Sequence, residues 1–478
     1  MARDLDADIC IIGAGSGGLS VAAGASQLGA RTLLIEQGKM GGDCLNSGCV
    51  PSKSLLVAAK AAAFGASSAK LGVHYGPPSV DFQAVHDHVH DVIASIAPMD
   101  SVERFEGLGV TVLRASARFV APRSLEAGGR RIKARRFVIA TGSQPAVPPI
   151  PGLDQVPYLT NESVFALTAL PNHLIVVGGG PIGCELGQAF RKLGAEVSIV
   201  EMASIMPKDD PELVEILRTR LRGDGVALYE RTRVIGAERD GDGDSAGVAL
   251  RVERNGQEER IAGSALLLAA GRRPTIAGLN LAAAGIAYDR GGIKVDARLR
   301  TSDKKVYAMG DVAGGYQFTH VAGYHAGIVI RNALFRLPAK ADMAAIPWVT
   351  YCDPELAHVG LGEEAARAAH GKISVLRWPF AENDRAQAER KTDGLVKAIV
   401  TPGGRILGAS IIAAQAGELI QPWVLALSQG LKIGALATMV APYPTLGEAS
   451  KRAAASFYTP KLFAARTKAI VRFLARLG

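Results

Sequence analysis

The chain contains two glycine-rich turns, each set between a short apolar run and a segment of small residues. The first turn carries Gly13, Gly15 and Gly18 directly after the apolar run at residues 8–12. The next apolar run ends in Glu36. Strand, GxGxxG turn, helix and a second strand ending in an acid are typical of a dinucleotide-binding unit in a parallel sheet. Gly13 allows the turn, Gly15 lets the backbone approach a pyrophosphate, and Gly18 lets helix and strand pack closely.

The second turn repeats this pattern further along the chain. Gly178, Gly180 and Gly183 follow the apolar run at residues 174–177, and Glu201 ends the following run. Two such units predict two bound dinucleotides, each with its phosphates at a helix N-terminus. Because no arginine follows Glu201 closely, its carboxylate is expected to accept a free ribose 2′-hydroxyl and to favour NADH over NADPH.

Two cysteines, Cys44 and Cys49, lie within the stretch GGDCLNSGCVPSK, directly after the first unit. They have three interpretations: metal ligands, free thiols or a redox disulfide. In a regular helix they would be about 7.5 Å apart along the axis, so a bond requires a distorted backbone, which Gly48 permits. Zinc prefers two further ligands nearby, and the chain has no second pair. Free thiols and a disulfide remain open, and the position of the pair favours a redox role.

At this stretch the sequence resembles the class I pyridine nucleotide–disulfide oxidoreductases, which include dihydrolipoamide dehydrogenase, glutathione reductase and mercuric reductase. The resemblance covers nearly the whole chain, because GAGSGG, the cysteine stretch, ATGS, GGGPIGCE, AAGRRP, MGDVAG and PYPTLGE follow in order. It is closest to the mercuric-reductase-like and dihydrolipoamide-dehydrogenase-like group. The resemblance implies a homodimeric enzyme with FAD on the first glycine turn and NAD(H) on the second.

The resemblance also assigns catalytic roles. It implies that Cys44 and Cys49 form the redox disulfide, with Cys49 beside the flavin and Cys44 as the interchange thiol. Lys53 is expected near the flavin ring, where it would stabilise negative charge, with Glu185 as its ion-pair partner. Tyr443 and Glu448 are expected to complete the site from the partner subunit.

Further cofactor contacts follow from the same resemblance. The FAD contacts are Gly13, Gly15, Gly18, Glu36, Gly42, Lys53, the main chain of Ala117, Thr141, Gly142, Asp311 and His320. The NAD contacts are Gly178, Gly180, Gly183, Glu201, Val234 and Gly271. No metal site is predicted, because His86, His88 and His90 read as the polar side of one helix.

The expected fold class is α/β, with two doubly wound dinucleotide-binding domains and a C-terminal α+β dimerisation domain. Apolar segments at 137–142, 266–271 and 306–311 are expected strands of the first two domains, and those at 394–400 and 406–412 form an antiparallel pair in the third. The expected boundaries are 1–155 and 275–345 for the FAD domain, 156–274 for the NAD domain, 346–460 for the interface domain and 461–478 for a basic amphipathic tail.

One position departs from the family pattern. Thiol-handling members carry a histidine before the Pro-Thr of the C-terminal motif, and Tyr443 occupies that position here. A tyrosine has an ordinary pKa of about 10, so it is a poor proton shuttle at neutral pH. A tyrosine there is similar to mercuric reductase, but the chain lacks the C-terminal cysteine pair of that enzyme.

The expected function is electron transfer from NADH through FAD to the Cys44–Cys49 disulfide and on to a disulfide, quinone or soft-metal acceptor. The alternatives are a dihydrolipoamide dehydrogenase that uses NAD⁺, and a redox-sensing or membrane-docked protein with little turnover. Identifying the electron acceptor would distinguish these three functions.

Composition narrows the partners and the location. The net charge is +9, but no basic block with interleaved aromatics occurs, so anionic ligands are expected rather than nucleic acid. Five cysteines, no signal peptide and no apolar stretch of about 20 residues favour a cytoplasmic protein. In the tail, Leu462, Phe463, Ile470, Phe473, Leu474 and Leu477 are expected to form one helix face. That face suits either peripheral contact with an anionic membrane or docking on its own subunit.

Overall fold

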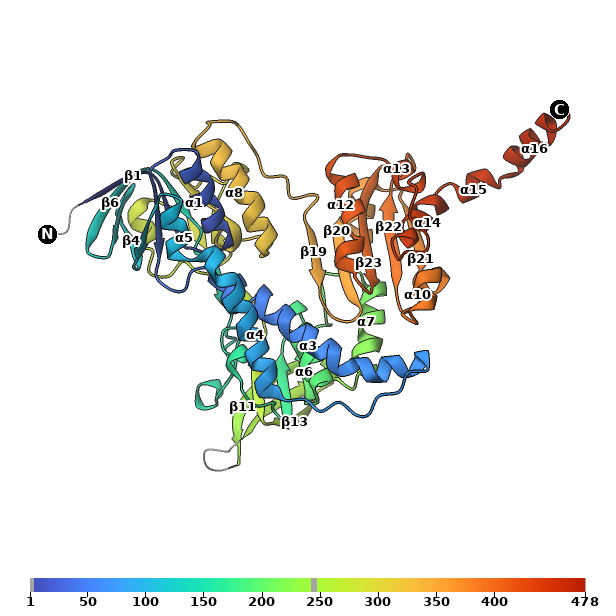
Figure 1. Cartoon of the computed structure of the whole chain (residues 1–478), viewed down its shortest axis with the longest axis horizontal. Helices are drawn as coiled ribbons and strands as arrows, with labels where there is room; N and C mark the ends of the chain where they lie inside the picture. Colours follow the sequence, from blue (N-terminus) through green and yellow to red (C-terminus); the bar gives the residue numbers. More distant parts are fainter. Residues whose placement is uncertain (1–3, 242–246, 478) are drawn as a thin grey trace. The chain divides into compact units, whose positions relative to one another are not determined.

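The computed structural model of the chain describes residues 4–241 and 247–477, which form two compact units. The first unit comprises Met1–Ala62, Ser79–Met202 and Tyr229–Asp342; the second comprises Ala63–Pro78, Ala203–Leu228 and Met343–Gly478. Figure 1 labels the elements of both.

The main sheet of the first unit has seven strands in the order β3-β2-β1-β6-β5-β4, with β18 beside β6. β2, β6 and β18 are joined to the sheet by parallel pairing, and β4 and β5 by antiparallel pairing. The strands are β1 (Leu5–Ile12), β2 (Thr32–Glu36), β3 (Val110–Arg114), β4 (Ala117–Ala121), β5 (Ser124–Ala127), β6 (Arg130–Ile139) and β18 (Val306–Ala308). Helices α1 (Ser16–Gln27) and α8 (Thr319–Ala333) bury apolar faces in one core beneath this sheet, because their small residues permit close packing.

A second, smaller sheet in the order β10-β9-β8-β14 carries the second glycine turn. Its strands are β8 (His173–Val177), β9 (Glu196–Glu201), β10 (Ala227–Glu230) and β14 (Ala265–Leu268), with helix α6 (Pro181–Leu193) between the first two. A three-stranded antiparallel sheet accompanies it, made of β11 (Thr232–Asp240), β12 (Gly247–Arg254) and β13 (Gln257–Gly263). Both β9 and β14 run parallel to β8, as the apolar runs predict.

The remaining elements of the first unit are short strands and connecting helices. They are α2 (Gly42–Asn46), α4 (Phe82–Ile96), α5 (Val102–Gly107), β7 (Ser143–Pro145), β15 (Arg272–Pro274), β16 (Tyr288–Asp289) and β17 (Gly292–Ile293). α3 (Cys49–Ser68) begins in this unit and ends in the second. In α4, Val89 is buried whereas His88 and His90 are exposed, so the histidines lie on the polar side of that helix.

The second unit contains a five-stranded antiparallel sheet in the order β19-β20-β23-β22-β21. The strands are β19 (Pro347–Thr350), β20 (Glu355–Gly360), β21 (Ser374–Pro379), β22 (Leu395–Val400) and β23 (Ile406–Ala413). The antiparallel pair predicted near residue 400 is therefore present as β22 and β23. Its helices are α7 (Pro211–Gly223), α9 (Glu363–His370), α10 (Asp384–Ala388), α11 (Ala416–Leu419), α12 (Gln421–Ser428), α13 (Ile433–Ala437), α14 (Glu448–Ser456), α15 (Thr459–Leu462) and α16 (Ala465–Leu474).

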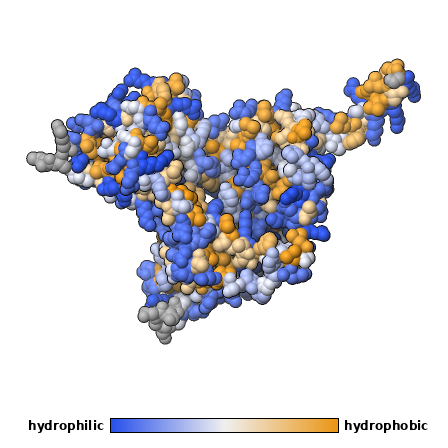
Figure 2. Space-filling model, in the orientation of Figure 1, coloured by the Kyte–Doolittle hydropathy of each residue, from blue (hydrophilic) through white to orange (hydrophobic). Residues whose placement is uncertain are grey.

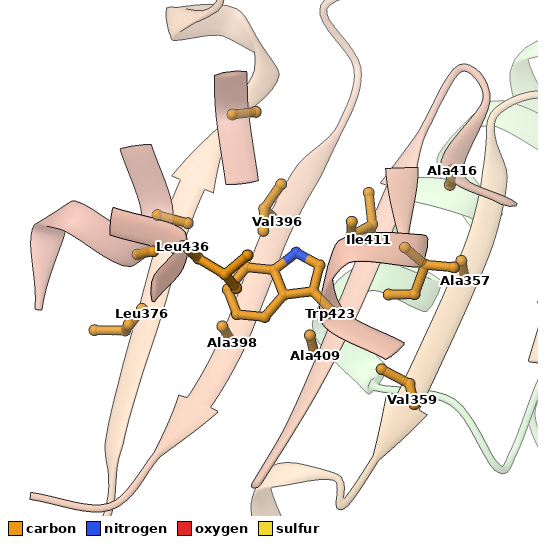
Figure 3. Packing of buried hydrophobic residues seen from close by; sticks show 14 of the residues in the cluster. Ala357, Val359, Leu376, Val396, Ala398, Ala409, Ile411, Ala416, Trp423 and Leu436 are labelled. Atoms are coloured by element: carbon orange, nitrogen blue, oxygen red, sulfur yellow. The ribbon is translucent and has the colours of Figure 1, made fainter. Parts of the chain in front are cut away.

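The core of the second unit surrounds Trp423, which is fully buried among side chains of the sheet and of α13 (Figure 3). Its indole Nε1 donates to Ser450 Oγ at 3.0 Å, which satisfies the polar atom of this side chain. A large aromatic residue with a satisfied donor fixes the helices over the sheet.

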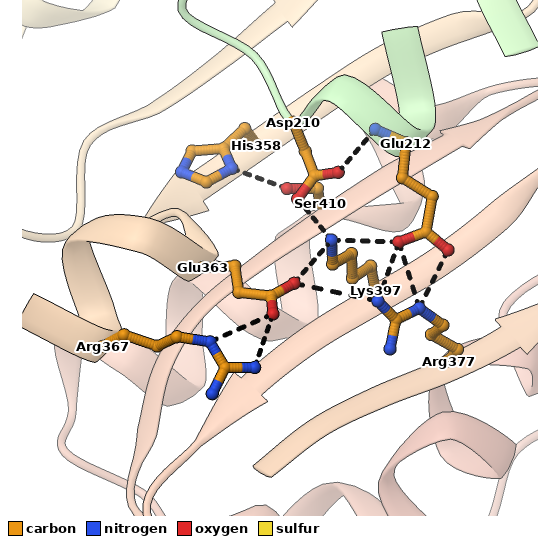
Figure 4. A network of polar contacts seen from close by, with 8 residues as sticks. All are labelled: Asp210, Glu212, His358, Glu363, Arg367, Arg377, Lys397 and Ser410. Atoms are coloured by element: carbon orange, nitrogen blue, oxygen red, sulfur yellow. Dashed lines mark hydrogen bonds and ion pairs between the residues drawn. The ribbon is translucent and has the colours of Figure 1, made fainter. Parts of the chain in front are cut away.

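Residues 203–228, which the sequence places in the NAD-binding domain, belong to the second unit because buried polar contacts hold them there. Lys397 of β22 is 4% exposed, and its ammonium lies 2.7 Å from Asp210, 3.0 Å from Glu212 and 2.9 Å from Glu363 (Figure 4). Asp210 also caps α7 by accepting from the N–H of Glu212. The finer division into FAD-binding, NAD-binding and interface domains stays a prediction.

The tail differs from the single helix face that the sequence predicts. α15 ends at Leu462, α16 begins at Ala465, and Phe463 lies in the break between them. Within the described residues, no helix is both long enough and apolar enough to cross a bilayer.

Candidate active site

The first glycine turn has the close contacts that its sequence predicts. A side chain at Gly13, whose φ is +105°, would place its Cβ 2.4 Å from the carbonyl oxygen of Ala140. A Cβ at Gly18 would lie 1.8 Å from the carbonyl oxygen of Gly13, so helix α1 and strand β1 can approach only with glycine there. At Gly15, by contrast, the nearest atom to such a Cβ is 3.9 Å away, on Gly42. The turn is therefore tightly packed at Gly13 and Gly18, and it leaves open space at Gly15, next to the N-terminus of α1.

The second turn has the same construction. A Cβ at Gly178 would lie 2.4 Å from the carbonyl oxygen of Ala269, and one at Gly183 would lie 1.9 Å from that of Gly178. A Cβ at Gly180 would meet no atom within 4 Å. Neither α1 nor α6 has a side-chain cap at its N-terminus. The open space and the uncapped N–H groups fit the phosphates of two dinucleotides.

The acids at the strand ends are held against these turns. Glu36 accepts from the N–H of Ala14 and of Gly38, both at 2.6 Å. Glu201 accepts from the N–H of Gly179 at 2.7 Å. Both carboxylates are therefore fixed at the turn, where a ribose hydroxyl of a bound dinucleotide is expected.

The cysteine stretch folds as two helices with a break between the thiols. α2 ends at Asn46 and α3 begins at Cys49, so Ser47 and Gly48 interrupt the helical geometry that would hold the sulfur atoms apart. A Cβ at Gly48 would lie 2.9 Å from the carbonyl oxygen of Asp43 and 3.2 Å from the Cα of Cys44. Gly48 thus permits the backbone to bring the two cysteines together, as the spacing requires.

Cys44 and Cys49 are both free thiols, and each shifts the pKa of the other. The hydrogen bond from Cys44, together with Thr319 and the positive charge of Lys53, lowers the pKa of Cys49 to about 6. The same interaction and burial raise the pKa of Cys44. At neutral pH the pair therefore carries its negative charge on Cys49, which is also the sulfur that lies 3.4 Å from Thr319 Oγ1.

The exposure of the two thiols differs from what their assigned roles imply. Cys49 is exposed and Cys44 is half-buried, whereas the resemblance gives Cys44 the substrate-facing role. The charge on Cys49 agrees with the flavin-side role. The division of roles stays a prediction.

Lys53 and Glu185 form the ion pair that the family resemblance implies. Lys53 Nζ donates to Glu185 Oε2 at 2.8 Å, and the Glu185 side chain is 6% exposed. The pair joins α3, which carries Cys49, to α6 at the second glycine turn. The positive charge of the Lys53 ammonium therefore acts on the Cys49 thiolate, and the buried carboxylate of Glu185 holds that ammonium in place.

A polar cluster behind the thiols joins four of the sequence motifs. Arg272 lies 3.2 Å from Asp43 and donates to Ser143 Oγ at 2.7 Å, and Ser143 donates to Asp311 at 2.5 Å. Asn161 donates to Asp43 at 3.0 Å. Burial raises the pKa of Asp311, and the neighbouring Ser143 and Arg272 partly offset this effect. The cluster joins helix α2, which carries Asp43 and Cys44, to Asp311 through Arg272 and Ser143.

The other predicted cofactor contacts lie in turns and strand ends of the first unit. Thr141 Oγ1 donates to the carbonyl of Thr275 at 2.7 Å, and His320 lies near the N-terminus of α8, stacked on Phe318. Among these contacts, Gly42, Gly142 and Gly271 have a positive φ, Ala117 begins β4, and Val234 lies at a bulge of β11. Their contacts with cofactors stay predictions.

Tyr443 and Glu448 lie in the second unit and have different partners. Tyr443 is 70% exposed, and its hydroxyl donates to Asp384 at 2.8 Å. This hydrogen bond raises the pKa of Tyr443. Glu448 instead pairs with Arg452 at 3.0 Å. Tyr443 is therefore a neutral hydrogen-bond donor at physiological pH.

Several functional contacts were missed from the sequence. Thr319 and Asp384 form hydrogen bonds with the predicted residues Cys49 and Tyr443, and the charge of Asp43 raises the pKa of Cys49. Thr319 adjoins His320 and Asp43 lies within the cysteine stretch, so the recognised motifs could have pointed to both residues. No recognised motif pointed to Asp384.

Comparisons with known proteins agree with this geometry. The family described as pyridine nucleotide-disulphide oxidoreductase matches residues 7–326, and its dimerisation domain matches residues 346–454. A mercuric reductase of Bacillus cereus is 36% identical over 95% of this chain and 72% of its own length. A dihydrolipoyl dehydrogenase of Thermus scotoductus is 35% identical over 94% of this chain and 97% of its own length.

Solved structures show the same similarity. The HOCl-induced flavoprotein disulfide reductase RclA from Escherichia coli has a TM-score of 0.83 at 30% identity, covering 94% of this chain and 99% of its own. LpdA from Mycobacterium tuberculosis has a TM-score of 0.85 at 26% identity, covering 95% and 99%.

Proposed function

Because the chain belongs to the pyridine nucleotide-disulphide oxidoreductase family, we propose that it is an NADH-dependent reductase that delivers electrons through a Cys44–Cys49 disulfide to a soft-metal or quinone acceptor. Members of this family are oxidoreductases that use FAD and NAD(P)H, and the matched dimerisation domain supports a homodimer. When bound, the two cofactors supply the two-electron reduction of the disulfide. The observation that carries the proposal is the low pKa of Cys49 together with a tyrosine in place of the proton shuttle.

The chain's own residues hold the cofactors and set the charge of the dithiol. The two open glycine turns and their helix N-termini fit the dinucleotide phosphates. The carboxylate of Glu201, fixed by the N–H of Gly179, would repel a 2′-phosphate and so favours NADH. Lys53, Thr319 and Cys44 stabilise the Cys49 thiolate.

The proposed class of electron acceptor is based on whether its reduction requires a proton from the enzyme. Reduction of an external disulfide releases a thiolate that must gain a proton, and a histidine with a pKa near about 6.5 supplies one well. Tyr443 supplies it poorly, because its hydrogen bond to Asp384 raises its pKa. A metal ion that takes electrons from the dithiol needs no such proton, since the disulfide forms as Cys44 loses its proton and the Cys49 thiolate has none to lose. Reduction of a quinone to the hydroquinone takes up two protons, so this argument favours a metal ion over a quinone. Relatives named mercuric reductase and a copper(II) complex of RclA support this acceptor class.

An acceptor screen with purified holoenzyme and NADH tests the proposal. Hg²⁺, Cu²⁺ or a quinone should support faster turnover than lipoamide or glutathione disulfide. Tyr443→His should raise lipoamide turnover and leave metal reduction nearly unchanged, with Tyr443→Phe as the control that removes the hydroxyl alone. Faster turnover of lipoamide than of every metal and quinone by the unaltered enzyme would refute the proposal.

Dihydrolipoamide dehydrogenase is the second candidate. The relative that bears this name in Thermus scotoductus is matched over 97% of its length, against 72% for the mercuric reductase of Bacillus cereus. Dihydrolipoamide-dependent reduction of NAD⁺ at a rate above the metal reactions would favour it. Slow turnover with every acceptor, combined with redox-dependent partner binding, would favour a sensor instead.

A further inference from the structure

The C-terminal helix α16 exposes a set of large apolar side chains. No residue of this helix is buried. The exposed fractions are 49% for Ile470, 61% for Val471, 61% for Phe473, 55% for Leu474 and, just beyond the helix, 69% for Leu477. In Figure 2 the tail displays hydrophobic residues next to hydrophilic ones. A group of exposed apolar side chains of this kind indicates a surface that binds a protein or a membrane.

On α16 most of the basic residues lie opposite a row of apolar residues, while Arg466, four residues before Ile470, lies on the apolar side. Ile470, Phe473 and Leu474 have the i, i+3, i+4 spacing of one helix face, which Leu477 continues at i+7. Lys468 and Arg472 are four residues apart on the other face, and Arg476 continues that row. At 100° per residue the centres of the two rows are nearly opposite.

The charge of the tail is all of one sign. The tail, residues 461–478, has five Lys and Arg residues and no Asp or Glu, whereas the whole chain has a net charge of +9. The tail therefore holds most of the net positive charge. An anionic bilayer complements both faces at once, because its acyl region accepts the apolar row while its phosphates accept the long basic side chains.

We propose that α16 binds the surface of an anionic phospholipid bilayer and so holds the enzyme at a membrane. The ten residues of α16 span about 15 Å, which is half the thickness of the hydrocarbon layer, so the helix lies in the interface plane. Each basic residue near an anionic surface strengthens binding about fivefold, so binding falls as salt rises.

Flotation of the full-length holoenzyme with vesicles tests this proposal. Vesicles of phosphatidylcholine with phosphatidylglycerol should carry the enzyme at low salt, and vesicles of phosphatidylcholine alone should carry far less. The triple change Lys468→Gln, Arg472→Gln and Arg476→Gln should weaken binding on the order of a hundredfold. The double change Phe473→Ser and Leu474→Ser should weaken it at least about a hundredfold with the charge intact.

The matched control removes three charges from exposed positions at the start of β6 in the first unit, with Arg130→Gln, Arg131→Gln and Lys133→Gln. This control should bind vesicles as the unaltered enzyme does, and all variants should keep their flavin content. An equal loss of binding in the control would assign the effect to bulk charge and overturn the proposal. A second result would also overturn the proposal. If the unaltered enzyme does not bind vesicles and the Phe473→Ser, Leu474→Ser variant dissociates into monomers, α16 covers a second copy of the chain.

Discussion

Cys49 should lose its low pKa when Cys44 is replaced by alanine. The hydrogen bond from Cys44 is the largest cause that lowers the pKa of Cys49 from 9.0 to about 6. Cys44→Ala removes this donor, while Thr319 and Lys53 remain. We therefore expect the pKa of Cys49 to rise by more than one pH unit towards that of an ordinary thiol.

The magnitude follows from the protonation equilibrium. A thiol with a pKa of about 6 is roughly nine-tenths ionised at pH 7, whereas one with a pKa near 9 is about one-hundredth ionised. Because the thiolate is the nucleophile, alkylation of Cys49 at pH 7 in Cys44→Ala should slow about twofold if the pKa rises by one unit and about tenfold if it rises by two. Cys10, Cys184 and Cys352 are buried, so they contribute little to this rate.

The assay is the pH dependence of iodoacetamide alkylation, with the modified cysteine identified by mass spectrometry. Cys44→Ser is the matched control, because its hydroxyl can still donate to the thiolate and should keep the pKa of Cys49 low. If Cys49 titrates near pH 6 in Cys44→Ala as well, the hydrogen bond is not the cause and the reasoning is refuted.

Three further predictions concern the rest of the chain. Lys397→Met should destabilise the second unit by about 3–5 kcal/mol, because it leaves three carboxylates without their shared cation; a urea midpoint equal to that of the unaltered protein would contradict this. Lys397 and Arg367 lower the pKa of Glu363 from 4.5 to about 2, so its contribution to stability is full above pH 4.5 and is lost as the pH falls towards 2; Glu363→Gln should flatten this part of the stability profile. Gly48→Ala should slow acceptor reduction by displacing Cys44, whereas Gly107→Ala, where a Cβ meets no atom, should not.

The local parts of the fold and of the site were predictable from the sequence. The two glycine turns and their flanking strands are present where the motifs place them. The Lys53–Glu185 pair joins residues 132 positions apart and was expected only from the family resemblance. Each glycine motif reports a contact that only a residue without a side chain can make, such as the approach of Gly18 to the carbonyl of Gly13. Because only glycine meets this requirement, the glycines occur at a fixed spacing that can be recognised in the sequence without the structure.

The contacts between distant segments left no such spacing. Thr319 reaches Cys49 across 270 positions, and Arg272 reaches Asp43 across 229. Residues 203–228 join the second unit because Lys397 is buried against Asp210, and a lone lysine within a strand gives no sign of its partner. These interactions depend on the packing of whole elements, so spacing could not predict them.

The same distinction explains why the sequence predicts the redox chemistry better than the acceptor. The charge of the dithiol depends mainly on groups within or beside one motif, since Cys44 and Lys53 are both close to Cys49 in the chain. The behaviour of Tyr443 depends on Asp384, which is 59 positions away in an unremarkable segment. A tyrosine without that carboxylate would have a lower pKa and would be a better proton donor, so the hydrogen bond, and not the tyrosine alone, argues against thiol acceptors. Asp384→Asn should therefore lower the pKa of Tyr443 towards the ordinary value of about 10, and an ultraviolet titration of the phenol that shows no such change would remove the contribution of Asp384 to the argument for a metal acceptor.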